Sequence, residues 1–184
     1  PPASSDGTGP RKPWSQVTTF LGRESSISCL IVTFAIAFNL YYLYPEVAIT
    51  VPKLNDGVLH LLALERAAVA LDTGHDPTDM WLAPIALGFP LFHYYQHLPF
   101  LLPAVLYHLS QGTLPLPDIF DWTGYLLLSF FPLSIYWSML RFGFSRLAAA
   151  LAGLVAPLIA TNGLFGLDFA SYVWRGYGLY TQLW

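Results

Sequence analysis

Residues 27–44 read ISCLIVTFAIAFNLYYLY, an apolar run on which the interpretation of the whole chain depends. Its length is close to the roughly 20 residues that an α-helix needs to cross about 30 Å of hydrocarbon. Arg23 precedes the run, tyrosines end it and Pro45 stops the helix, so we expect a membrane span with the N-terminus in the cytoplasm. Asn39 lies inside this span, and we expect it to bond another helix.

The composition supports a membrane protein. The chain has 184 residues, of which 55% are hydrophobic and only 10% are charged. A soluble domain carries about 25% charged residues, and a chain of this size cannot bury so much apolar surface. The net charge of −3 comes with scattered basic residues, which gives no indication of nucleic-acid binding. The single cysteine, Cys29, excludes a disulfide framework.

Further apolar stretches predict spans over 122–140 and 147–165. Arg141 and Arg146 bracket the turn between them and place that turn in the cytoplasm. A cytoplasmic turn agrees with a cytoplasmic N-terminus only if residues 98–110 do not cross the membrane fully, or if an extra crossing lies nearby. That stretch is short and contains prolines, so it is either a span or a re-entrant or interfacial helix.

The expected fold is an all-α, polytopic integral membrane protein with three to four spans and interfacial helices in a large first external loop. Residues 1–24 are expected to form a flexible cytoplasmic tail, because they are rich in Pro, Ser, Gly and Thr. The membrane domain then covers 25–184, with an external loop over 45–97 and an external segment over 166–184. The sequence ends in an unfinished pattern, so we expect that a longer protein continues beyond it.

The external loop begins with a predicted surface helix over 56–71, capped by Asn55 or Asp56 and ended by Gly74. Asp56 and His60 are four residues apart and share a helix face. A partly desolvated carboxylate at the membrane boundary can serve as a general base, assisted by the imidazole. The alternative is that Asp56 only caps the helix and His60 is an interfacial residue.

Two histidines near the end of the loop have the same spacing. On a helix, His93 and His97 can bind a metal together, or one of them can ligate a tetrapyrrole. Further ligands would come from Asp76, Asp79 or His108. The alternative is a belt of amphipathic rings at the membrane interface.

The last segment places Asp168 and Arg175 among glycines and aromatic residues. The guanidinium of Arg175 can hold a phosphate or carboxylate with two hydrogen bonds. The alternative is an interface loop with one surface ion pair.

Several ordered motifs carry a family resemblance. They are NDGVLH at 55–60, PLFHYY at 90–95, LRFGFS at 140–145 and WRGYGLYTQ at 174–182. Together they resemble a group of bacterial multi-pass membrane proteins labelled as related to 6-pyruvoyl-tetrahydropterin synthase, whose architecture is similar to that of GT-C glycosyltransferases. The resemblance covers about 25–184.

The resemblance implies a transferase of the bacterial inner membrane that uses a sugar linked to a polyprenyl phosphate on the outer face. Nothing in the chain supplies the metal triad of a pterin synthase, and no metal ligand is assigned. Gly57 stands where some relatives have a second acidic residue. The implied catalytic residues are Asp56, His60 and Asp168. The implied substrate-binding residues are His93, Tyr94, Tyr95, Arg175 and Tyr177.

In the implied reaction Asp56 deprotonates or orients an acceptor hydroxyl, while Arg175 or His60 offsets the charge of the departing lipid phosphate. The alternative function is a noncatalytic accessory or structural subunit of a larger membrane complex, which can hold a cofactor through His93 and His97. Expected partners are therefore the lipid bilayer, a lipid-phosphate-linked sugar and other membrane subunits.

Overall fold

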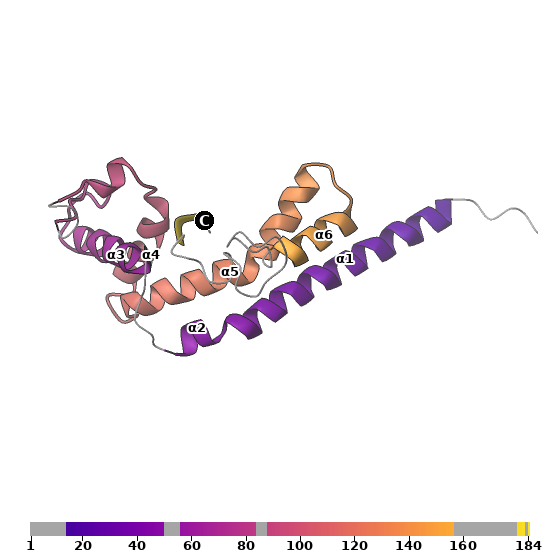
Figure 1. The fold of residues 1–184 in the computed structure, drawn as a ribbon, viewed down its shortest axis with the longest axis horizontal. Helices are drawn as coiled ribbons and strands as arrows, with labels where there is room; N and C mark the ends of the chain where they lie inside the picture. Colours follow the sequence, from indigo (N-terminus) through magenta and orange to yellow (C-terminus); the bar gives the residue numbers. More distant parts are fainter. Residues whose placement is uncertain (1–13, 50–55, 84–87, 157–179, 183) are drawn as a thin grey trace, which may run out of the picture.

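The computed structural model describes residues 14–49, 56–83, 88–156, 180–182 and 184, and the all-α fold is confirmed for them. Extended pairing in this part of the chain is limited to one antiparallel bridge between Leu82 and Phe89. In chain order the helices are α1 (Trp14–Leu43), α2 (Pro45–Ala48), α3 (Asp56–Asp72), η1 (Leu91–His93), α4 (Leu98–Leu109), α5 (Leu116–Arg141), α6 (Arg146–Val155) and η3 (Tyr180–Gln182) (Figure 1).

Two stretches are long and apolar enough to cross a membrane, Glu24–Ala48 with 25 residues and Leu116–Arg141 with 26. At about 1.5 Å per residue, 25 residues reach roughly 37 Å, which exceeds the hydrocarbon core of a bilayer. They contain the helices predicted over 27–44 and 122–140.

The other predicted segments have different outcomes. α4 has only 12 residues, with Pro103 inside, so at about 1.5 Å per residue it is too short to cross alone. α6 is described to Val155, and the rest of the span predicted over 147–165 lies outside the described residues. α1 already begins at Trp14, within the stretch expected to be a tail, while residues 1–13 are outside the description.

α1 and α5 lie side by side and antiparallel, with α6 against both (Figure 1). The side-chain amide of Asn39 donates to the carbonyl of Leu128 over 3.3 Å, which confirms the expected bond to another helix. The hydroxyl of Tyr125 donates to the carbonyl of Leu40 over 2.8 Å. That carbonyl belongs to the last turn of α1, where helical donors run out. Each helix therefore satisfies a backbone group of the other.

Pro132 explains why the Leu128 carbonyl accepts a side chain. It lies inside α5 and has no N–H, so Leu128, four residues earlier, lacks its usual helical donor. An unsatisfied carbonyl is costly in an apolar environment. Asn39 supplies the missing donor from α1 and fixes the register of the two helices.

A double-mutant cycle tests this arrangement. We expect Asn39→Leu to destabilise the protein by about 1–2 kcal/mol, because the Leu128 carbonyl is left unsatisfied. In a Pro132→Ala background the same change should cost much less, because residue 132 then supplies a backbone N–H. Unfolding in detergent measures both costs, and equal costs in the two backgrounds would contradict the explanation.

The α5–α6 turn follows from Gly143 and Ser145. Gly143 has φ +85, a conformation that glycine adopts readily, and its N–H bonds the Leu140 carbonyl to end α5. Ser145 then caps α6, its hydroxyl accepting from the N–H of Ala148 over 3.2 Å. The Glu24 carboxylate of α1 accepts from the Leu147 N–H over 3.3 Å. The amino-terminal part of α1 therefore lies beside this turn.

Small residues allow α6 to approach α5 closely. Ala149, Ala150 and Gly153 are buried, and a Cβ at Gly153 would lie 2.6 Å from the Pro132 carbonyl oxygen. Small side chains that let backbones meet are typical of helix packing in membranes.

At the other end of the α1–α5 pair lies a unit that we call the loop subdomain, residues 56–83 and 88–109, built on the packing of α3 against α4. The predicted helix over 56–71 is confirmed; it ends at Asp72, and Gly74 just past its end has φ +72. The His75 N–H bonds the Ala70 carbonyl and the Gly74 N–H bonds the Leu71 carbonyl, which closes the helix. The buried face of α3 consists of Ala63, Leu64, Ala67 and Ala68.

Candidate functional site

His60 lies in the core of the loop subdomain and is only 1% exposed. Its ring centroid is 5.8 Å from those of Phe100 and Tyr180 and 6.1 Å from that of Tyr95. The structure thus brings together two predicted site residues, His60 and Tyr95. It does so inside a packed aromatic cluster. His60 was predicted either at the membrane interface or against a substrate phosphate, and its burial in the cluster fits neither position.

Tyr180 joins the C-terminal residues to this cluster. Its hydroxyl donates to the Pro99 carbonyl over 3.1 Å, and the hydroxyl of Thr181 donates to that of Tyr95 over 3.4 Å. Burial raises the pKa of the Tyr180 phenol well above its usual range, so the hydroxyl stays protonated and remains a donor. The Tyr180 ring also lies 4.6 Å from that of Phe120 in α5. Tyr180 therefore links the loop subdomain to α5.

The histidine pair predicted to share a helix does not share one. His93 ends η1, whereas His97 is the residue before α4, and the backbone between them is irregular. His93 Nε2 contacts the Asp79 carboxylate at 3.1 Å, and His97 Nε2 contacts the Phe92 carbonyl at 2.9 Å. The shared helix that this interpretation assumed is therefore not present between His93 and His97.

The remaining candidate ligands also have separate partners. His108 Nδ1 lies 2.6 Å from the Asp72 carboxylate, which ties the ends of α4 and α3 together. Asp76 accepts from the hydroxyl and the N–H of Thr78, and these bonds hold the pKa of its carboxyl below the usual range. Within the described ranges, no three His, Cys, Asp or Glu side chains gather as a metal site would require.

Of the other predicted site residues, Tyr94 is exposed on the loop subdomain and stacks on Phe89 at 5.6 Å. Asp56 is the first residue of α3, one turn before His60. Asp168, Arg175 and Tyr177 lie outside the described residues.

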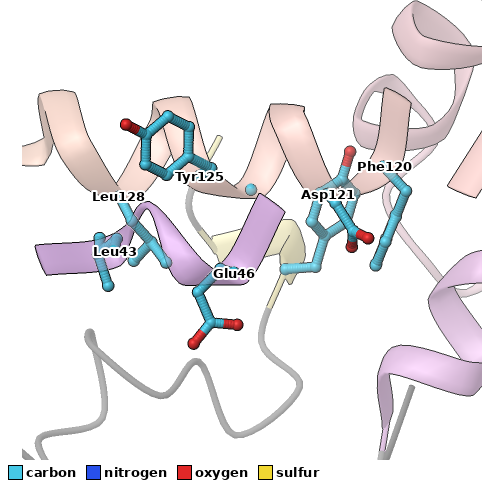
Figure 2. Close-up of a pocket in the computed structure, with 8 residues that line it drawn as sticks. Leu43, Glu46, Phe120, Asp121, Tyr125 and Leu128 are labelled. Carbon is cyan, nitrogen blue, oxygen red and sulfur yellow. The ribbon is translucent and has the colours of Figure 1, made fainter. Parts of the chain in front are cut away.

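A hollow of about 130 Å³ lies where the end of α1 and α2 meet the beginning of α5. Figure 2 shows two carboxylates extending toward the same side, that of Glu46 from α2 and that of Asp121 from α5. We call this site the acidic hollow, and its lining residues are Leu43, Glu46, Phe120, Asp121, Gly124, Tyr125, Leu128 and Tyr180.

The chemistry of the acidic hollow combines negative charge with aromatic surface. Among the described residues that line it there is no Lys, Arg or His. Glu46 is exposed, whereas Phe120, Tyr125 and Tyr180 are largely buried and form its walls. Such a site can accept the proton of a hydroxyl group or attract a cation.

Neither carboxylate of the acidic hollow is among the site residues predicted from the sequence. Glu46 follows the predicted first span after Pro45, and Asp121 directly precedes the predicted span over 122–140. Acidic residues at the matching ends of two antiparallel spans were the available signal. Only the pairing of α1 with α5 shows that they line one hollow.

Comparisons with protein-family models, with curated proteins and with solved structures find no match to this chain. The resemblance to the GT-C-like group stays a prediction from the motifs.

Proposed function

We propose that this chain is an integral protein of the bacterial inner membrane in which α1 and α5 cross the bilayer. In the most apolar windows of these helices only 28% and 17% of residues are buried, unlike the core helix of a soluble protein. One face of α5 carries large apolar side chains that are 43% to 58% exposed. They are Trp122, Leu126, Phe130, Leu133 and Trp137. Tryptophans near both ends of this face suit the two membrane interfaces.

The orientation follows from the basic residues. Arg23, next to Glu24, lies at the same end of the α1–α5 pair as Arg141 and Arg146, because Glu24 contacts the start of α6. The excess of Lys and Arg in cytoplasmic loops then places this end inside. Arg141 also stacks on Trp137 at 4.9 Å, an arrangement suited to the headgroup region.

This orientation places the loop subdomain and the acidic hollow outside. It agrees with the prediction in which residues 98–110 do not cross the membrane fully, because α1 and α5 are then one outward and one inward crossing without α4. The start of α6 lies at the inner end, whereas Tyr180 packs at the outer end. Because these two points lie at opposite ends of the α1–α5 pair, we propose a third crossing in the region predicted over 147–165.

For the activity, we propose transfer of a sugar from a polyprenyl phosphate to a hydroxyl acceptor at the outer face. The observation that carries this proposal is the acidic hollow, which holds Glu46 and Asp121 at the outer end of both membrane-length helices. A carboxylate there, or Asp56 as the resemblance implies, takes the proton of the acceptor hydroxyl. The acceptor oxygen bonds to the anomeric carbon, and the bond from that carbon to the phosphate oxygen breaks.

The remaining parts of the reaction are assigned by chemistry. The polyprenyl chain lies in the bilayer along the exposed apolar faces of α1 and α5. The developing negative charge on the lipid phosphate needs a cation, and Arg175 is the predicted one.

Transfer from a lipid-linked sugar in vesicles containing the full protein tests the proposal. We expect Glu46→Gln or Asp121→Asn to lower the rate by about 100-fold or more, as loss of a general base does, and Asp56→Asn to do the same if Asp56 is the base. Asp118→Asn changes a charge in the same helix outside the hollow and should keep the rate. Undiminished transfer in all three site variants would contradict the proposal.

A further inference from the structure

We propose that α4 is an interfacial helix whose exposed face lies in the outer leaflet of the bilayer and anchors the loop subdomain there. The inference rests on the crossing of α5 in the proposed function, and it goes further by assigning a lipid contact to a helix that does not span. The partner of this face is the acyl region just below the headgroups.

The first argument is the pattern of exposure along α4. Five large aliphatic side chains of this helix are between 39% and 73% exposed. They are Leu98, Leu102, Val105, Leu106 and Leu109. Steps of four, three, one and three residues place them on one face of an α-helix. The core of the loop subdomain takes other side chains of α4, which are Pro99, Phe100, Pro103 and Ala104. A continuous aliphatic face of α4 is therefore left exposed.

The second argument is the position of α4 beside a membrane-length helix. α4 packs against both α3 and α5 (Figure 1). The connection to α5 is a tight turn, in which the N–H of Gln111 bonds the His108 carbonyl and the N–H of Thr113 bonds the Ser110 carbonyl. α5 then begins at Leu116. The end of α4 thus lies at the level where α5 begins, which is the membrane interface when α5 crosses.

Apolar exposure also continues along the chain from α4 into α5. Leu109 ends α4, Leu114 lies in the connection, and Trp122 begins the face of α5 that is proposed to contact lipid. All three side chains are exposed. The face of α4 is therefore continuous in sequence with a surface that already has the bilayer as its proposed partner.

The third argument separates lipid from a protein partner. Protein interfaces are enriched in aromatic residues, methionine and arginine, and leucine and valine are under-represented among the side chains that dominate protein binding. The exposed face of α4 is made of four leucines and a valine. α4 contains no Asp, Glu, Lys or Arg, and its one histidine, His108, contacts the Asp72 carboxylate. Hydrocarbon accepts such a face without any specific contact.

Site-directed spin labelling of the full protein in phosphatidylcholine vesicles tests this inference. In a Cys29→Ala background, Leu102→Cys carries the label on the exposed face of α4, and Glu65→Cys is the control at an exposed position of α3. Oxygen concentrates in hydrocarbon, whereas a neutral nickel chelate stays in water. We expect the ratio of oxygen to chelate collisions to be about fivefold or more higher at residue 102 than at residue 65. Leu109→Cys, on the same face, should repeat the result.

A further label, introduced with Phe130→Cys in the middle of α5, reports the proposed crossing in the same vesicles. Oxygen contact at residue 130 together with chelate contact at residue 102 would leave α5 as a span and overturn the inference about α4. A label at residue 102 shielded from both reagents would also overturn it, because protein would then cover the face. Chelate contact at both positions would contradict the crossing itself, and the inference would fall with it.

Discussion

Replacing Phe100 with alanine is expected to destabilise the loop subdomain by about 3–5 kcal/mol, the usual cost of removing a buried phenylalanine ring. Phe100 is 0% exposed. Its ring centroid lies 5.4 Å from that of Phe92, 5.8 Å from that of His60 and 6.1 Å from that of Tyr180. Removing the ring leaves a cavity among side chains from three separate parts of the chain.

Hydrogen exchange of the protein in detergent measures this effect. Amides of α3 and α4 should lose protection in Phe100→Ala, while amides in the middle of α5 should keep theirs. Leu102→Ala is the control, because Leu102 lies in the same helix and is 49% exposed. Similar exchange in the two variants would show that the aromatic cluster does not hold the loop subdomain together.

Phe130→Arg is expected to weaken membrane insertion of α5 by about 3 kcal/mol, or roughly a hundredfold in the insertion equilibrium. Phe130 lies near the middle of α5 on its exposed apolar face. In the proposed crossing this exposed side chain faces lipid, and an arginine there must reach an interface or draw water inward.

The fraction of protein that resists alkaline extraction from membranes reports insertion. Phe142→Arg is the matched control, since Phe142 lies in the turn after α5 and is 80% exposed. We expect that variant to insert normally, because the proposed orientation places the turn in the cytoplasmic interface. If the two variants were extracted equally, α5 would not be a span.

The helices were predictable because their signals are local. Apolar length predicted α1 and α5, Gly74 predicted the end of α3, and Asn39 predicted a bond between helices. The turn at Gly143 follows from a residue that readily takes the left-handed conformation.

The error over the histidines also has a local cause. A helix running from His93 into α4 would hold Pro99 in its interior in addition to Pro103, and each interior proline removes a helical N–H and clashes with the carbonyl four residues earlier. α4 therefore begins at Leu98, with Pro99 in its first turn, and the two histidines cannot share a face. Pro99 was visible in the sequence, and its effect on helix formation outweighs the helical spacing of His93 and His97.

The acidic hollow could not be predicted in the same way, because its residues come from distant parts of the chain. Glu46 and Asp121 are far apart in the chain and line one hollow only because α1 pairs with α5 in one register. The burial of His60 likewise depends on rings from α4 and from Tyr180. The roles predicted for Asp168, Arg175 and Tyr177 stay predictions.

The central claim is that the acidic hollow and the loop subdomain face outward while the arginine-flanked turn faces the cytoplasm. Single cysteines at opposite ends test it directly in a Cys29→Ala background, using a membrane-impermeant maleimide on spheroplasts. Glu65→Cys in α3 should be labelled at once, and Phe144→Cys in the turn should be labelled only after the membrane is permeabilised. Immediate labelling of Phe144→Cys, or labelling of Glu65→Cys only after permeabilisation, would contradict the account.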